Sequence, residues 1–199
     1  LFEDKFERLG FLAKPGEADE DEMVRQIVLS NLVTAQSPQV LAEASHLFVQ
    51  YHDNLEAIPA AIRSVLLINE LKTSETSALL NEYIDYYVKT NDGNFKRQLA
   101  AAVSYTKSED HLNTILECLE DKDIVKPQDL STWYAFLLSQ EFAQETVWNW
   151  ATDNWEWIKS TLGGDMSFDA FVIIPARILK TQNMFEAYKA FFEPQLDDM

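Results

Sequence analysis

The sequence predicts an all-α fold, an irregular armadillo- or HEAT-like α–α superhelix of about ten antiparallel helices. Apolar residues recur at helical spacing along almost the whole chain of 199 residues. Glycine and proline are scarce, with 5 and 6 residues, so few positions favour tight turns. No convincing run alternates apolar and polar residues with the period of a strand. We therefore expect helices joined by short loops throughout.

The first half of the chain contains five apolar stripes with the spacing of amphipathic helices. In chain order they occupy residues 24–33, 41–51, 58–66, 79–88 and 95–103. Ser37 followed by Pro38 places a capping hydroxyl before a proline at the first helical position, which predicts a helix start. Asp92-Gly93 predicts a stop or a turn.

The second half repeats this pattern with five further helical segments. They occupy residues 112–119, 130–137, 143–162, 168–179 and 184–192. Ser108, Pro127 and Ser167 resemble helix starts, and Gly163-Gly164 predicts a stop.

The short connections force consecutive helices to lie antiparallel. Helix starts spaced by roughly 14 to 20 residues make pairs of about 35 residues, within the range of paired-helix solenoids. The tetratricopeptide pattern is absent and no strict repeat is legible, so an irregular stack is expected rather than a regular array. A four-helix bundle would leave too many helices over. We expect residues 1–199 to form a single helical domain.

The segment TVWNWATDNWEWIKSTLGG holds four of the five tryptophans as two Trp-x-Trp pairs. On one continuous helix over residues 143–162, Trp148 and Trp155 fall on one edge of the apolar face, and Trp150 and Trp157 fall on the other. This pattern predicts a helix wedged between two neighbours, with Trp155 largely buried and each indole N–H reaching a polar partner at the margin. An aromatic binding groove is the alternative.

Asn154 falls inside the apolar face of the same helix. A buried amide must be hydrogen-bonded, so we interpret Asn154 as a clamp to the backbone of a neighbouring helix. A ligand contact is the alternative.

The charge and the cysteine content exclude several classes of partner. The formal net charge of −17 repels phosphate backbones and anionic lipid, so neither nucleic acid nor a membrane is expected as a partner. No apolar run approaches the roughly 20 residues that span a bilayer, and no signal peptide is visible. The single cysteine, Cys118, cannot form an internal disulfide, which suits a reducing compartment.

No catalytic or metal-binding constellation is legible. The three histidines, His46, His52 and His111, are scattered, and Glu43 with His46 matches only one part of a di-iron site. Cys118 lies on an apolar helix face without a basic neighbour, as expected of an inert core thiol. We therefore expect no catalytic residue, no metal ligand and no cofactor in this chain.

Three arginines stand out as rare cations in an acidic chain. Arg63, Arg97 and Arg177 could each bind a carboxylate and are the candidates for peptide contact. Pairing with a nearby Asp or Glu is the commoner fate of such residues.

From Asn94 to the end, several packing motifs follow one another in a fixed order. They comprise an arginine-led helix (Arg97, Leu99), the turn Val125-Lys126-Pro127-Gln128-Asp129, an Asn-Trp pair (Asn154, Trp155) and a final helix with Thr181, Phe191 and Phe192. This order of motifs resembles the helical C-terminal domain of the zinc-dependent alanyl and lysyl aminopeptidases, the aminopeptidase N family that includes the endoplasmic-reticulum aminopeptidases. Upstream, RLGF and DEMVRQIVLSNLVTA also resemble this family.

The resemblance implies a C-terminal fragment of a larger zinc enzyme that removes N-terminal amino acids from peptides. The zinc ligands and the general-base glutamate of that family lie on an H-E-x-x-H helix in another domain, and this motif is absent here. The chain would then cap the active site and control peptide access, with its own upstream catalytic domain and peptide substrates as partners. A cytoplasmic, bacterial member is favoured. The alternative is a stand-alone α-solenoid scaffold for protein–protein interaction.

Overall fold

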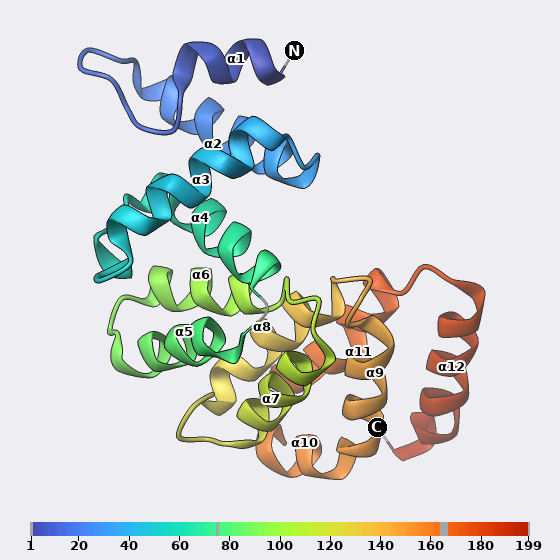
Figure 1. Ribbon diagram of the computed structural model, residues 1–199. Coiled ribbons are helices and arrows are strands. Elements are labelled where there is room, and N and C mark those ends of the chain that lie inside the picture. Colours follow the sequence, from blue (N-terminus) through green and yellow to red (C-terminus); the bar gives the residue numbers. More distant parts are fainter. Residues whose placement is uncertain (1, 75, 164–166, 199) are drawn as a thin grey trace. The chain divides into compact units, whose positions relative to one another are not determined.

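The computed structural model describes residues 2–74, 76–163 and 167–198 (Figure 1). The regular elements in this part of the chain are twelve α-helices and two 3-10 helices, without a strand, so the predicted all-α class is confirmed. The residues group into two compact units, Leu1–Thr106 and Lys107–Met199. A single domain over residues 1–199 stays a prediction.

The first unit is built from consecutive helix pairs. Its elements are α1 (Phe2–Leu9), α2 (Asp19–Thr34), α3 (Pro38–Tyr51), the 3-10 helix η1 (Leu55–Ala57), α4 (Ala60–Thr73), α5 (Ser77–Lys89) and α6 (Gly93–Val103). Helix α1 packs on α2, α3 on α4 and α5 on α6, while α4 also contacts both α2 and α6. Alternate helices therefore form a layer, α2–α4–α6, as in an α–α stack.

The second unit is less regular. Its elements are α7 (Glu109–Glu120), α8 (Pro127–Leu138), α9 (Gln144–Asp153), α10 (Trp155–Leu162), α11 (Ser167–Ile178), α12 (Gln182–Phe192) and the 3-10 helix η2 (Glu193–Asp198). Helix α8 packs against α9 and α11, and the ring of Tyr134 stacks on that of Phe171 with centroids 4.4 Å apart. Both side chains are fully buried, so this contact lies in the core of the unit.

The described chain has two α-helices more than the ten that the apolar stripes predict. The first addition is α1, in which only Phe6 and Leu9 are buried, too few for a recognisable stripe. It is joined to α2 by contacts that periodicity cannot show: Arg8 pairs with Asp21, and the buried Arg25 donates to the carbonyl oxygen of Leu9 at 3.4 Å. The second addition comes from the tryptophan segment.

The predicted single helix over residues 143–162 is wrong, because the chain breaks at Asn154 between α9 and α10. Asn154 has φ −98° and ψ 17°, outside the helical region. Its backbone N–H and its side-chain amide both donate to the carbonyl oxygen of Trp150 at 3.0 Å. Asparagine competes for helical backbone groups in this way, so the amide closes the last turn of α9 and does not clamp a separate element.

The tryptophan pairs nevertheless lie on two sides, as the projection predicts. Trp148 and Trp155 both contact the rings of Phe191 and Phe192 in α12. Trp150 contacts Trp157. Trp148, Trp150 and Trp155 are buried, which confirms the burial predicted for Trp155, whereas Trp157 is half-buried.

Among the described residues, one indole of this group has the predicted polar partner at the margin. Trp150 donates through Nε1 to Glu120 Oε1 of α7 at 2.9 Å. Within the described residues, Nε1 of Trp155 is buried without an acceptor, which contradicts the expectation for this residue.

Most predicted helix starts are confirmed. Pro38 and Pro127 are the first residues of α3 and α8, and the Ser108 hydroxyl accepts from the backbone N–H of His111 at the start of α7. Ser37 precedes α3, but its side chain makes no capping hydrogen bond.

The glycine signals have a mixed outcome. Asp92-Gly93 is the beginning of α6, not a stop or a turn: the Asp92 carboxylate accepts from the backbone N–H groups of Asn94 and Phe95. Gly163 follows the last residue of α10, as predicted, and Gly164 lies outside the described residues.

None of the described helices is both long and apolar enough to cross a lipid bilayer.

Candidate functional site

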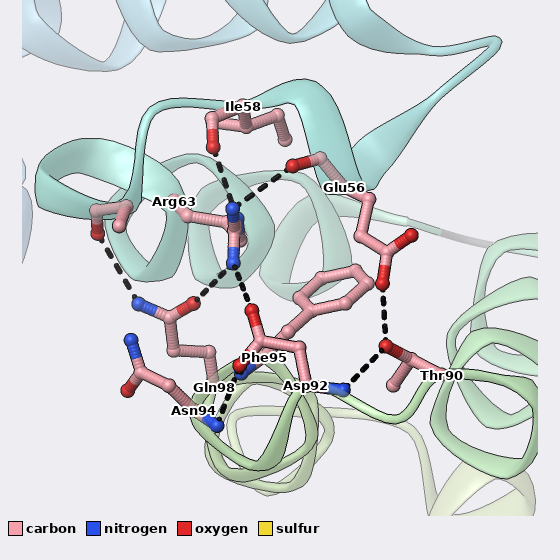
Figure 2. Close-up of polar contacts among 9 residues, drawn as sticks. Glu56, Ile58, Arg63, Thr90, Asp92, Asn94, Phe95 and Gln98 are labelled. Carbon is pink, nitrogen blue, oxygen red and sulfur yellow. Dashed lines mark hydrogen bonds and ion pairs between the residues drawn. The ribbon is translucent and has the colours of Figure 1, made fainter.

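Arg63, the first of the three candidate arginines, is buried in the first unit beside the N-terminus of α6 (Figure 2). Its Nε donates to the carbonyl oxygen of Ile58 at 3.0 Å, and its Nη2 donates to that of Glu56 at 2.9 Å. The guanidinium lies over the ring of Phe95, 4.7 Å from the centroid. The cation is therefore enclosed by the turn before its own helix and by an aromatic ring of α6.

The remaining donors of Arg63 reach polar side chains near the start of α6. Nη1 donates to Gln98 Oε1 at 3.2 Å, and it lies 3.7 Å from Asp92 Oδ2. Gln98 in turn donates to the carbonyl oxygen of Ala60 at 3.2 Å. This network joins the start of α4 to the start of α6. Contact of Arg63 with a peptide stays a prediction, and it would require these bonds to be exchanged.

A second set of hydrogen bonds extends the network to the turn before α6. The Thr90 hydroxyl donates to the Glu56 carboxylate and accepts from the backbone N–H of Asp92 at 3.1 Å (Figure 2). The sequence predicts a turn or a stop at Asp92 and gives no signal for Glu56 or Thr90. The usable signal was the Asp-Gly-Asn sequence before an apolar stripe, which is also typical of a helix N-terminus.

The other two candidate arginines are exposed. Arg97 lies on α6. Arg177 lies in the last turn of α11 and lines a surface hollow with Glu141, Gln144 and Lys180. The hollow carries two cations and one carboxylate, a composition that attracts an anion only weakly. Carboxylate binding by Arg97 and Arg177 stays a prediction.

The sequence does not predict a partly buried ion pair in the first unit. Arg25 of α2 is buried and pairs with Glu17, which also accepts from the backbone N–H of Lys14 at 3.0 Å. The hydrogen bond from Arg25 and then that from Lys14 hold the pKa of the Glu17 carboxyl below its usual value. The pair ties the loop after α1 to α2, and its position gives it a structural role.

Cys118 is a buried thiol, as the apolar face of α7 predicts. Burial, followed by the carboxylates of Asp121 and Glu117, raises its pKa to about 11. The reactive thiolate is thus scarce at neutral pH.

We expect iodoacetamide at pH 8 to alkylate Cys118 at least ~100-fold more slowly in the native chain than in urea, since each unit of pKa removes about nine-tenths of the thiolate. Mass spectrometry of quenched samples measures both rates. Cys118 is the only cysteine, so every adduct reports on it. Equal rates in the two states would show that the thiol is accessible and unperturbed.

Among the described residues, no group of three or more His, Cys, Asp or Glu side chains is arranged to hold a metal ion. His46 and His52 are exposed, and His111 is buried in α7.

The comparisons with known proteins agree along the whole chain. The model of the ERAP1-like C-terminal domain family matches residues 1–199. An aminopeptidase N of Lactococcus lactis subsp. lactis is 55% identical over 197 residues, which cover 99% of this chain and 23% of that protein. An aminopeptidase N of Lactobacillus helveticus is 38% identical, with 99% and 23% covered.

More distant similarity extends to a glutamyl aminopeptidase of Rattus norvegicus, which is 26% identical over 69% of this chain and 14% of that protein. The chain thus spans about a quarter of the length of the bacterial relatives that it matches. Since the family match covers every residue and the fold is all-α, the chain belongs to the family of ERAP1-like C-terminal domains.

Proposed function

We propose that this chain is the C-terminal helical domain of a zinc aminopeptidase N that removes N-terminal amino acids from peptides, and that the domain caps the active site and controls access to it. The observation that carries the proposal is the 55% identity to an aminopeptidase N over 99% of this chain. Its partners would be the upstream catalytic domain and peptide substrates.

The contribution of such a domain would be access and positioning rather than chemistry. The described residues offer no cluster fit to hold zinc, so no step of the reaction is assigned to them. The one thiol is buried and has a raised pKa, which makes it a poor nucleophile. A wall of stacked helices can still accelerate hydrolysis elsewhere by excluding water and by holding a peptide in place.

Deletion of residues 1–199 from the parent enzyme tests this role. We expect kcat/KM for a peptide of about seven residues to fall at least about tenfold more than kcat/KM for a single-residue chromogenic amide, because only the longer substrate reaches this domain. Steady-state kinetics on both substrates measures the ratio.

The control for this deletion is the folded state of the remaining enzyme, checked by circular dichroism and by its zinc content. Unchanged kinetics on both substrates in a folded, zinc-loaded truncation would contradict the proposal, and a stand-alone scaffold function would then be favoured.

We also propose a cytoplasmic location. The support is compositional, since a chain with one cysteine does not rely on internal disulfides and suits a reducing compartment.

A further inference from the structure

Asp92 and Gly93 form the only Asp-Gly step in the chain, and the sequence contains no Asn-Gly step. In an Asp-Gly step the backbone nitrogen of the glycine can attack the side-chain carboxyl carbon of the aspartate, because glycine has no Cβ to crowd the approach. The product is a five-membered cyclic imide. Whether this reaction proceeds in a folded protein depends on how the fold presents the two residues.

The structure leaves both reacting groups of this step accessible. The Asp92 side chain is 46% exposed, so water reaches its carboxylate. Apart from the adjacent chain and the backbone of α6 itself, no atom lies within 4 Å of the position that a Cβ of Gly93 would occupy. Within the described residues, the backbone N–H of Gly93 donates no hydrogen bond, as is usual for the first residue of an α-helix.

The same carboxylate is held in place as the cap of α6 (Figure 2). Asp92 Oδ1 accepts from the backbone N–H groups of Asn94 at 2.9 Å and Phe95 at 3.2 Å. Asp92 Oδ2 lies 3.7 Å from Nη1 of Arg63. A bond to the Gly93 nitrogen would turn the carboxyl group away from these donors, so the reaction requires the first turn of α6 to open.

From this placement we propose that Asp92 is a site of spontaneous isomerisation to isoaspartate, at a rate set by opening of the first turn of α6. The Gly93 nitrogen bonds to Cγ of the protonated carboxyl group, and its proton leaves with the carboxyl hydroxyl as water. A second water then opens the imide. Cleavage of the bond between nitrogen and Cγ restores aspartate, and cleavage of the bond between nitrogen and the original main-chain carbonyl carbon gives isoaspartate.

Isoaspartate would alter the start of α6, because the main chain then runs through Cβ and the carboxylate sits on a shorter branch. The N–H groups of Asn94 and Phe95 would lose the acceptor that caps them. Arg63 would lose the carboxylate of its ion pair, while its hydrogen bonds to two carbonyl oxygens would remain. The modification therefore loosens α6 at its first turn and leaves the rest of the Arg63 network in place.

The test incubates the full chain in its folded state at mildly acidic pH and physiological temperature for several weeks. Trypsin cleaves after Lys89 and Lys96, so residues 90–96 are released as one peptide with a single aspartate. Isoaspartate has the mass of aspartate but a different chromatographic retention, and isoaspartyl methyltransferase labels it with a methyl group from S-adenosylmethionine. We expect labelled isoaspartate in this peptide, formed at least about threefold more slowly than in a synthetic peptide of the same sequence, because the cap restrains the carboxylate.

Two variants and one internal control identify the chemistry. Gly93→Ala should slow the reaction at least about tenfold, since a Cβ crowds the attacking nitrogen, and alanine fits the open space at this position. Asp92→Glu keeps the charge but would have to close a six-membered ring, so no label is expected in it. Asp85 is 69% exposed and is followed by Tyr86, and it should stay unmodified in the same samples.

Hydrogen exchange measures the structural consequence in the modified chain after its chromatographic separation. The amide hydrogens of Asn94 and Phe95 should exchange at least about fivefold faster than in the unmodified chain, as expected for a helix that loses its cap. Thermal unfolding checks that both variants are folded.

The proposal is overturned if residues 90–96 of the chain contain no isoaspartate while the synthetic peptide forms it, or if Gly93→Ala reacts as fast as the unaltered chain. Equal rates in the folded chain and the synthetic peptide would contradict control of the rate by the first turn of α6. These results do not depend on the proposed function, which is tested separately by the deletion of residues 1–199.

Discussion

Replacement of Trp155 by alanine is expected to lower the free energy of unfolding by about 3–5 kcal/mol, as is usual for a large buried aromatic side chain. Trp155 is buried and contacts three rings, with centroids 5.2 Å away for Phe168, 5.5 Å for Phe191 and 5.2 Å for Phe192. Its removal leaves a cavity where α10, α11 and α12 meet. Urea unfolding followed by circular dichroism measures the change.

Trp157→Ala is the matched control, since Trp157 is half-buried on the same helix and, within the described residues, its ring contacts that of Trp150. We expect it to lose about 1 kcal/mol, the usual effect of a partly exposed position. A loss below about 1 kcal/mol for Trp155→Ala would show that the indole is exposed in solution, and it would favour the aromatic binding groove.

Replacement of Arg63 by alanine is expected to lower the free energy of unfolding by about 2–4 kcal/mol, because a buried acceptor left without its donor costs about 1–3 kcal/mol. The carbonyl oxygens of Ile58 and Glu56 would each lose a donor. The ring of Phe95 would lose its cation. The same urea experiment measures this change.

Two variants separate the parts of the Arg63 network. Asp92→Asn removes the carboxylate charge but keeps a side-chain oxygen for capping α6, and the pair that it breaks is 3.7 Å long with Asp92 46% exposed. We expect a loss below about 1 kcal/mol, as for other exposed ion pairs. Arg97→Ala controls for the loss of an arginine on the surface. If Arg63→Ala costs no more than Asp92→Asn, the hydrogen bonds to the two carbonyls do not stabilise the fold.

The sequence alone determined the fold class, most helix starts and the family. These depend on local signals: the spacing of apolar residues, a proline at the first position of α3 and α8, and the order of packing motifs. It also separated the tryptophans into two pairs. Trp148 and Trp155 both contact Phe191, whereas Trp150 and Trp157 contact each other. Helical periodicity depends only on residues that are close together in the sequence, so the sequence is sufficient to detect it.

The tertiary structure alone decided which polar groups meet. One local contact also escaped the projection, because a helical wheel does not test whether the Asn154 amide turns back to Trp150, four residues earlier. Arg63 meets Gln98 across 35 residues of the chain, and a surface hollow brings Ser30 of α2 close to Ser64 of α4 and to Tyr105 in the turn after α6. Hydrogen bonds are short and directional, so their partners follow from how helices pack and not from spacing along the chain.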